Sequence, residues 1–545
     1  MVHKRVPCAT DIDVKILGES LKFQSGKQAS NRFLKAAMTE RLSSFDPDSD
    51  EKTGIPGQEI FNIYDKWAHG GFGMILTGNV AVHPKNLEYA GNAIIHKEGY
   101  TEEKKAAFKK YAQLTKKDGS LAVVQLTHAG RQTPLGVNPH PFSPSDIQLK
   151  DHGKPIPLTI EQVQTEVVDR FAFAAKATYE AGFDGVQLHA AHGYLLSQFI
   201  SNTTNKRKDQ YGGSIENRYR VIGETYRKIR ELIPASTGFI VGIKVNSVEF
   251  QAEGMTLEEG QAVAALIEAE GFDFVELSGG NMEGWAFHHK RDSTVKREAF
   301  FLEFARKIRP EFKKTVVYLT GGFRTAKGMI DAIQEGATQG IGLGRPVAAE
   351  PDLPKKILSG QAFSAAETAL DQNNFGVTVT ASNSQMEQLG RTSVKEANGD
   401  LLKYVSDMSD KGVADRYVKA TEKYFAEVGE VVKNGKPVIG VLTCNSYSDV
   451  ALTVYPVSYT FLMTKTTIEP ILSGDMLMDD LIDECGDNGG LCFVAVFSNS
   501  YDKGYSLLVA DEDKDYSCAV DPNCLSFTKE NYLYTIVIDL NNGED

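Results

Sequence analysis

Short, uninterrupted apolar runs recur along the first two thirds of the chain, separated by longer segments with helical spacing. A run without alternating polar positions is typical of a strand buried on both faces, as in a parallel sheet. The pattern therefore predicts eight buried strands, at Leu34–Met38, Met74–Val80, Leu121–Leu126, Val186–Leu188, Ile240–Val245, Phe274–Leu277, Val316–Leu319 and Gly340–Leu343.

The segments between these runs read as helices. The clearest carries Val163, Val167, Phe171 and Ala175 at intervals of four and ends at Gly182, a residue suited to cap a helix. Eight strand-then-helix units over roughly 310 residues favour a (β/α)8 TIM barrel. An open, doubly wound parallel sheet is the alternative.

The chain is longer than a single hydrophobic core usually holds, and its negative charge is concentrated near the C-terminus. Residues 446–545 contain 18 Asp and Glu against 4 Lys and no Arg, a formal charge of −14 in a chain of net charge −13. We expect a barrel over residues 1–370, a helical extension over 371–437 and an acidic segment over 438–545. That segment is either a small β-rich domain or an extension without a stable fold, and its sequence indicates no function.

Composition excludes several classes of protein. No apolar stretch is long enough for a membrane span, the first residues lack the apolar region of a secretory signal, and no basic patch indicates nucleic acid. Five of the six cysteines follow residue 440, at spacings that fit no zinc signature. We expect a cytoplasmic protein, monomeric or homodimeric, that acts on a small molecule without nucleic-acid or membrane partners.

The fourth predicted strand ends in three side chains that handle protons: His189, His192 and Tyr194. Two closely spaced imidazoles can donate hydrogen bonds to one ligand oxygen, and the phenol can protonate a neighbouring carbon. Core histidines with structural hydrogen bonds, or a metal-binding pair, are the alternatives. A metal pair lacks a third ligand at suitable spacing.

Other candidate residues stand at the ends of the predicted strands, where barrel enzymes place their active sites. They are Thr39, Asn79, Gln125, Lys244, Ser278, Gly322 and Arg345. Lys244 alone also permits a barrel lyase that forms a Schiff base.

Five motifs in order resemble the old yellow enzyme family of FMN oxidoreductases, from residue 15 to about 360. They are Asn31-Arg32 with Ala36-Ala37-Met38-Thr39, Gln125 to Arg131, His189 to Tyr194, Asn205 to Ser214 with Asn217-Arg218, and Gly342 to Pro346. One branch of that family carries an iron–sulfur cluster on cysteines after the barrel. Residues 345–443 contain no cysteine, so we expect no cluster here.

The resemblance implies an FMN site at the strand ends. Gly322, Gly344 and Arg345 would hold the phosphate, and Gln125 the pyrimidine edge. The backbone of Ala37 and the hydroxyl of Thr39 would meet the N5 and O4 edge, and Asn79 would lie beside the ring. Lys244 would stabilise negative charge at N1 and C2=O, at a position where the family commonly has arginine.

The resemblance also implies the reaction. NADH or NADPH would bind transiently and pass a hydride to the flavin, which passes it to an α,β-unsaturated carbonyl or a similar electrophile. His189 and His192 would bind the carbonyl oxygen and Tyr194 would supply the proton. The alternative is a catalytically silent barrel whose role lies in the acidic segment. Specificity is expected in Asn281–Arg297, where Trp285, Phe287, His288 and His289 would cover the flavin.

Overall fold

The computed structural model describes residues 4–150, 152–246, 254–279 and 302–443, and the backbone of three short strands nearer the C-terminus. Contacts divide the chain into two compact units, Met1–Val454 and Tyr455–Asp545. The domain limits expected from the sequence, at residues 370 and 437, stay predictions.

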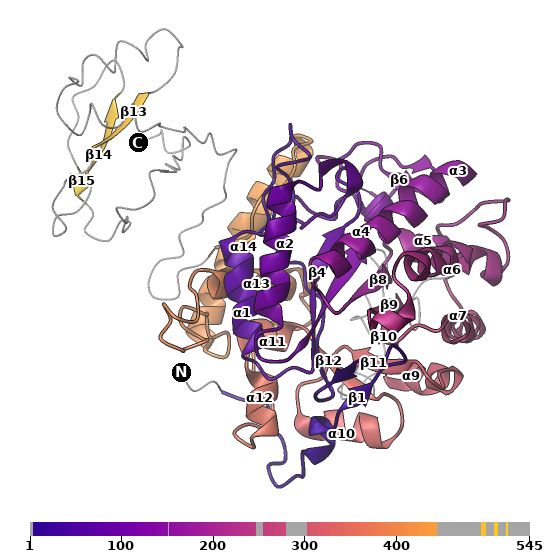
Figure 1. The fold of residues 1–545 in the computed structure, drawn as a ribbon. Coiled ribbons are helices and arrows are strands. Elements are labelled where there is room, and N and C mark those ends of the chain that lie inside the picture. The colour runs from indigo at the N-terminus through magenta and orange to yellow at the C-terminus, as the bar shows by residue number, and fades with distance from the viewer. Residues whose placement is uncertain are drawn as a thin grey trace. The chain divides into compact units, whose positions relative to one another are not determined.

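Eight parallel strands close into a barrel at the centre of the first unit (Figure 1). Both ends of the strand series are paired, since Ile341 of the last strand lies in register with Phe33 of the first. This closure confirms the TIM barrel and rules out the open sheet. In chain order the strands are β3 (Phe33–Lys35), β4 (Met74–Ala81), β5 (Leu121–Thr127), β8 (Gly185–Ala190), β9 (Ile240–Asn246), β10 (Phe274–Ser278), β11 (Val316–Thr320) and β12 (Gly340–Leu343).

The first strand is shorter than its apolar run predicts. β3 ends at Lys35, and the apolar residues that follow leave the sheet toward the carboxyl end of the barrel. β4 carries a register shift between Leu76 and Asn79. At this irregularity the Gly78 N–H donates to Glu40 Oε1 at 2.9 Å and to the Tyr64 hydroxyl at 2.7 Å.

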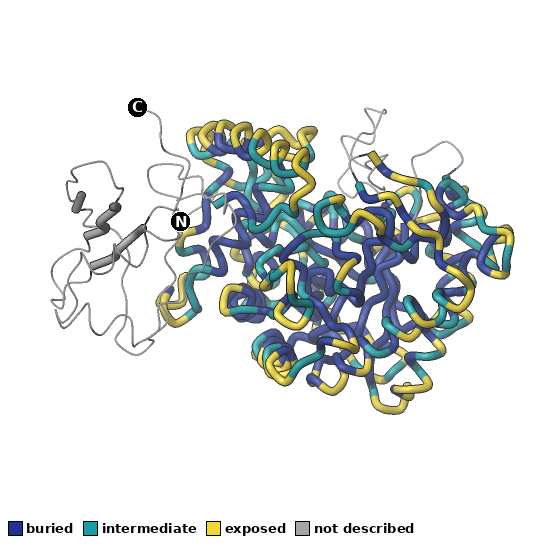
Figure 2. The backbone as a smooth tube through the Cα atoms, turned by 90° about the horizontal axis from the view of Figure 1, so that it is seen from above, coloured by how far each residue is buried: buried dark blue, intermediate teal, exposed yellow. Residues whose placement is uncertain are grey.

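Apolar side chains fill the amino end of the barrel. Phe274 lies between Phe23 and Tyr318, with ring centroids 6.1 Å and 5.9 Å away. Phe23 belongs to a hairpin formed by β1 (Leu21–Lys22) and β2 (Gln28–Ala29) beneath the strands. Figure 2 shows the buried strands at the centre and exposed positions on the outer helices. With this end filled, a ligand site belongs at the opposite, carboxyl end.

Helices surround the barrel. The predicted helix at Val163–Ala175 is a continuous segment of α3 (Ile160–Gln162), a π-helical stretch (Val163–Val168) and α4 (Asp169–Glu180). Gly182 follows it at φ 89°, the left-handed conformation that its predicted capping role requires. The other covering helices are α1 (Gln58–Ala68), α2 (Glu102–Thr115), α5 (Leu195–Ile200), α6 (Ile215–Leu232), α7 (Leu257–Glu270), α9 (Leu302–Ile308), α10 (Ala326–Gln334), α11 (Arg345–Ala349) and α12 (Leu353–Leu358).

Two further helices, α13 (Phe375–Gly390) and α14 (Lys411–Lys433), follow the barrel (Figure 1). α13 packs against α1 and α11, and α14 packs against α13. The end of α13 is held by α1, because Lys66 Nζ donates to the Leu389 carbonyl at 2.7 Å. The extension is thus helical, as predicted, and α13 packs against the barrel.

The second unit contains a three-stranded antiparallel sheet of β13 (Cys492–Val496), β14 (Ser506–Ala510) and β15 (Ala519–Val520). The covering loop predicted at 281–297 lies outside the described residues. Within the part of the chain that is described, no helix is long and apolar enough to cross a membrane.

Candidate active site

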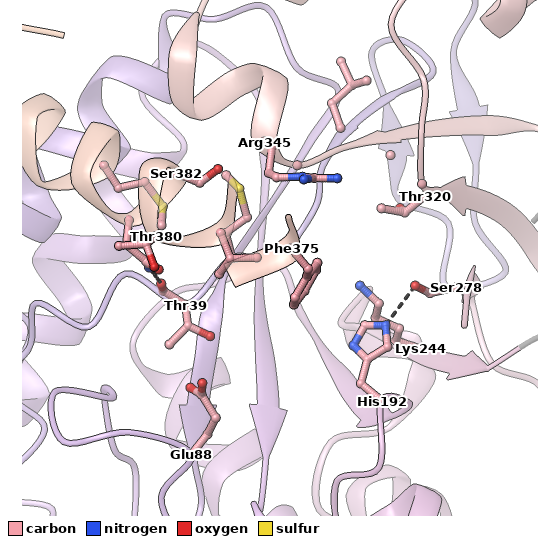
Figure 3. A pocket seen from close by; sticks show the side chains of 18 of the residues that line it. Thr39, Glu88, His192, Lys244, Ser278, Thr320, Arg345, Phe375, Thr380 and Ser382 are labelled. Atoms are coloured by element: carbon pink, nitrogen blue, oxygen red, sulfur yellow. Dashed lines mark hydrogen bonds between the residues drawn. The ribbon is translucent and has the colours of Figure 1, made fainter. Parts of the chain in front are cut away.

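A cavity of about 730 Å³ opens at the carboxyl ends of the barrel strands. This volume lies in the range of small-molecule sites. Its walls come from β9 to β12, from the segments after β3, β4, β5 and β8, and from α13 (Figure 3). Seven of the predicted site residues line it: Thr39, His192, Tyr194, Lys244, Gly322, Gly344 and Arg345.

The turn after β8 brings the two histidines and the tyrosine together. The His189 ring centroid lies 5.3 Å from that of His192 and 4.6 Å from that of Tyr194. His192 has φ 59°, a left-handed conformation that is unusual for a non-glycine residue. Its carbonyl accepts from Gln132 Nε2 at 2.6 Å, which holds the turn in place. His189 does not line the cavity but is buried beside the two residues that do.

The surroundings of these three residues keep them uncharged. Burial lowers the pKa of His189 and of His192 well below the usual value, and the charge of Lys244 lowers both further. Burial raises the pKa of Tyr194 well above its usual value, and the charge of Glu88 adds a smaller rise. Near neutral pH the imidazoles are therefore neutral and the phenol keeps its proton.

Ser278, one of the residues predicted at the strand ends, also lines the cavity, and its bond to His192, which the sequence did not predict, fixes how His192 can bind a ligand. His192 Nε2 lies 2.9 Å from Ser278 Oγ (Figure 3). A neutral imidazole has one donor and one acceptor nitrogen. With Nε2 engaged by the hydroxyl, Nδ1 is the other atom available for a hydrogen bond.

Lys244 is the last member of a buried series of hydrogen-bonded polar side chains that crosses four strands. Its ammonium lies 2.9 Å from Glu276 Oε1, and both side chains are almost fully buried. Glu276 also accepts from Gln187 at 2.8 Å, and Gln187 accepts from Gln125 at 2.7 Å. Gln125 does not itself line the cavity. Sequence reasoning missed Glu276 and Gln187, although each is a polar residue inside an apolar strand.

Thr39 is held from two sides. Its hydroxyl donates to Asn79 Oδ1 at 2.8 Å, and its carbonyl accepts from Asn383 Nδ2 of α13 at 2.7 Å. Asn79 and Ala37 lie close to Thr39 but do not line the cavity. Sequence reasoning also missed the α13 residues in the wall, and no local pattern indicates them: Phe375, Gly376, Val379, Thr380, Ser382, Asn383 and Met386.

The glycine-rich end of the cavity has room for an anionic group. Gly321 and Gly322 adopt φ 137° and 86°. A Cβ added at Gly344 would find its nearest neighbour 3.8 Å away, so the backbone is open there. Arg345 donates to Thr378 Oγ1 at 2.8 Å, and burial lowers the pKa of its guanidinium.

These features fit FMN. Two buried polar atoms in the wall, Thr320 Oγ1 and Asn383 Oδ1, have no hydrogen-bond partner among the described residues. Such atoms are costly unless a ligand pairs them. A planar ring with polar edges would lie among Thr39, Asn383 and Lys244, and a phosphate would lie beside the glycines and Arg345. The barrel and this cavity define a cofactor-dependent barrel enzyme.

Residues 18–363 match the family described as NADH:flavin oxidoreductase / NADH oxidase, and the chain belongs to that family of FMN-dependent oxidoreductases. It is 41% identical over 388 residues to the NADH-dependent flavin oxidoreductase nadA of Aspergillus parasiticus, covering 70% of this chain and 86% of that protein. It is 33% identical to the NADH-dependent flavin oxidoreductase iliE of Hypocrea jecorina, covering 62% and 88%.

Solved structures show the same fold. The old yellow enzyme homologue from Zymomonas mobilis matches with a TM-score of 0.52 at 22% identity, covering 64% of this chain and 94% of that one. Morphinone reductase in complex with tetrahydroNAD matches with a TM-score of 0.52 at 23% identity, covering 64% and 92%. These two structures therefore share the barrel fold of this chain.

Proposed function

We propose that this enzyme reduces the carbon–carbon double bond of α,β-unsaturated carbonyl compounds, using NADH or NADPH. The observation that carries the proposal is the grouping of two neutral imidazoles and a protonated phenol at one turn, with His192 and Tyr194 in the wall of the cavity. The similarity to the NADH-dependent flavin oxidoreductases nadA and iliE, at 41% and 33% identity, supports a nicotinamide donor.

FMN held in this cavity would supply hydride transfer from the nicotinamide to the β-carbon of the substrate. The proton for the α-carbon would come from Tyr194, so the double bond gains one hydride and one proton. Negative charge develops on the carbonyl oxygen as the hydride arrives. His192, with His189 behind it, would stabilise that charge by hydrogen bonding.

The other predicted residues would bind the cofactor. Lys244 would lie near the N1 and C2=O edge and Thr39 near N5 and O4, and Arg345 would neutralise the phosphate. Asn79 and Gln125 would act through Thr39 and Gln187, since their side chains are bonded to those residues. Ala37 would contribute its backbone.

The ion pair at Lys244 argues against the lyase alternative. A Schiff-base lysine must direct its nitrogen at the substrate carbonyl, whereas Lys244 Nζ is engaged by Glu276 Oε1 at 2.9 Å. Monomeric or homodimeric assembly, a cytoplasmic location and the absence of nucleic-acid and membrane partners stay predictions.

The test is a pair of half-reactions followed by flavin absorbance under anaerobic conditions. NADH should bleach the FMN-loaded protein, and 2-cyclohexenone should restore its colour. Tyr194→Phe should keep the bleaching rate but slow the recolouring by a factor on the order of 10²–10³, as the loss of one transition-state donor does. The proposal is wrong if the protein does not take up FMN, or if the enone fails to reoxidise the reduced wild type.

A further inference from the structure

An ion pair in the cavity wall has no part in the reaction proposed above. Arg41 Nη2 lies 3.2 Å from Glu88 Oε1, with the two side chains 23% and 15% exposed. Both residues line the cavity. Figure 3 shows the Glu88 carboxylate directed toward the side of the cavity where Thr39 lies.

Arg41 is held in a fixed orientation. Its backbone has φ 64°, in the left-handed region. Its guanidinium lies over the Tyr89 ring, 3.8 Å from the centroid. Tyr89 is itself anchored, because its hydroxyl donates to the Gly440 carbonyl at 3.2 Å. The cation is therefore a built part of the wall rather than a mobile surface group.

Glu88 is tied to the same wall. Asn92 Nδ2 lies 3.5 Å from Glu88 Oε2 and 3.3 Å from Asn79 Oδ1, the atom that also accepts from Thr39. The charges of the pair also act on Tyr194, whose pKa Glu88 raises and Arg41 lowers. The pair is thus linked to Thr39 through Asn92 and Asn79, it shares the cavity wall with Tyr194, and its charges reach that phenol.

The Arg41–Glu88 pair presents the N–H donors of a guanidinium while its two charges cancel. A guanidinium has five N–H donors, and Glu88 Oε1 accepts from Arg41 at Nη2 alone among the bonds seen between these two side chains. Glu88 cancels the charge of Arg41 but leaves donors for a ligand oxygen. A carboxylate placed here would face the like charge of Glu88, whereas an uncharged carbonyl or amide would accept a hydrogen bond from Arg41.

We propose that the Arg41–Glu88 pair selects the substrate class of this cavity. It accepts an uncharged, oxygen-bearing substituent remote from the reacting double bond, and Glu88 disfavours substrates with a carboxylate at that position. The inference rests on the proposed function, because the pair acts on a substrate that His192 and Tyr194 hold.

The test uses two phenols of nearly equal shape, 4-hydroxybenzamide and 4-hydroxybenzoate, titrated into the FMN-loaded protein by flavin absorbance and by calorimetry. The wild type should bind the amide about tenfold more tightly than the carboxylate, since like charges at close range oppose binding. In Glu88→Gln the carboxylate should bind about tenfold more tightly, because Glu88 no longer repels it or cancels the positive charge of Arg41. The affinity for the uncharged amide should change little. Adding Arg41→Gln to that variant should abolish the gain.

Two further variants keep the result unambiguous. Glu88→Asp retains the charge and should retain the preference for the amide. Glu161→Gln removes an exposed carboxylate from α3, away from the cavity, and should leave both affinities at the wild-type values. The proposal is overturned if Glu88→Gln changes both phenols equally or leaves the carboxylate unaffected. If neither phenol binds the FMN-loaded wild type, the proposed function itself is wrong. If both phenols bind without the expected difference, the role of the Arg41–Glu88 pair alone is wrong.

Discussion

At the scale of single residues, burial prepares the acid–base groups more than any charged partner does. It is the largest cause of the lowered pKa of His189 and His192 and of the raised pKa of Tyr194. Neutral imidazoles suit this reaction because each can donate a hydrogen bond without placing a fixed positive charge next to Lys244. A protonated phenol suits it because the α-carbon needs a proton at the moment the hydride arrives.

This protonation pattern predicts a rate of enone reduction that does not vary with pH between about 6.5 and 10, the ordinary pKa values of free imidazole and phenol. Tyr194 acts while protonated, and its raised pKa moves the alkaline fall in rate above 10. The imidazoles act while neutral, and their lowered pKa moves any acidic change below 6.5. Stopped-flow reoxidation of the reduced enzyme by 2-cyclohexenone measures this directly. An alkaline fall centred below pH 9 would show that Tyr194 is not the donor.

At the scale of elements, the catalytic geometry depends on irregular places in otherwise regular strands. The Gly78 N–H at the β4 irregularity is bonded to Glu40 and Tyr64, and Glu40 directly follows Thr39. A Cβ at Gly78 would overlap the Glu40 carboxylate. The irregularity therefore lets β4 come close to the segment that carries Thr39.

Gly78→Ala should accordingly destabilise the protein by about 1–3 kcal/mol, the usual cost of overpacking a core. It should also weaken FMN binding, because Glu40 and Thr39 must move together. Gly429→Ala, at an open position in α14, is the matched control and should stabilise by about 0.5–1 kcal/mol. Urea unfolding and FMN titration measure both effects. A Gly78→Ala protein as stable as the wild type would mean that Glu40 relocates freely.

The elements themselves were largely predictable, because each barrel strand is a continuous apolar run. The exception is β3, which ends at Lys35 although Ala36–Met38 remain apolar. The Ala36 N–H still donates to the Leu343 carbonyl of β12 at 2.9 Å, and Met38 lines the cavity, an arrangement that hydrophobicity alone does not indicate. Lys35 itself is fully buried between Leu76 and Tyr64, and burial lowers its pKa to about 7.

The site was predictable where its residues lie next to one another in sequence or stand at strand ends. His189, His192, Tyr194 and Lys244 are of this kind. Glu276 was not predicted, because its importance comes from pairing with Lys244 across two strands. Asn383 and the rest of the α13 wall were not predicted either, because which helix docks over a cavity is decided by tertiary packing.

At the scale of the whole molecule, the net negative charge and the candidate active site belong to different parts of the chain. The described residues that line the cavity run from Met38 to Met386, within the unit Met1–Val454. Residues 446–545 have a formal charge of −14, and the rest of the chain has a formal charge of +1, which together give the net charge of −13. The catalytic unit is thus nearly neutral by itself.

Removing residues 444–545 should therefore leave FMN content, the melting temperature and the rate of enone reduction unchanged. The truncated protein should lose its binding to an anion exchanger at neutral pH, because its formal charge changes from −13 to +1. A second truncation that also removes α13 and α14 is the informative contrast. It should lose FMN, because Asn383 no longer holds the Thr39 carbonyl and the α13 wall of the cavity is gone. Loss of FMN from the shorter truncation alone would show that the acidic residues take part in the site.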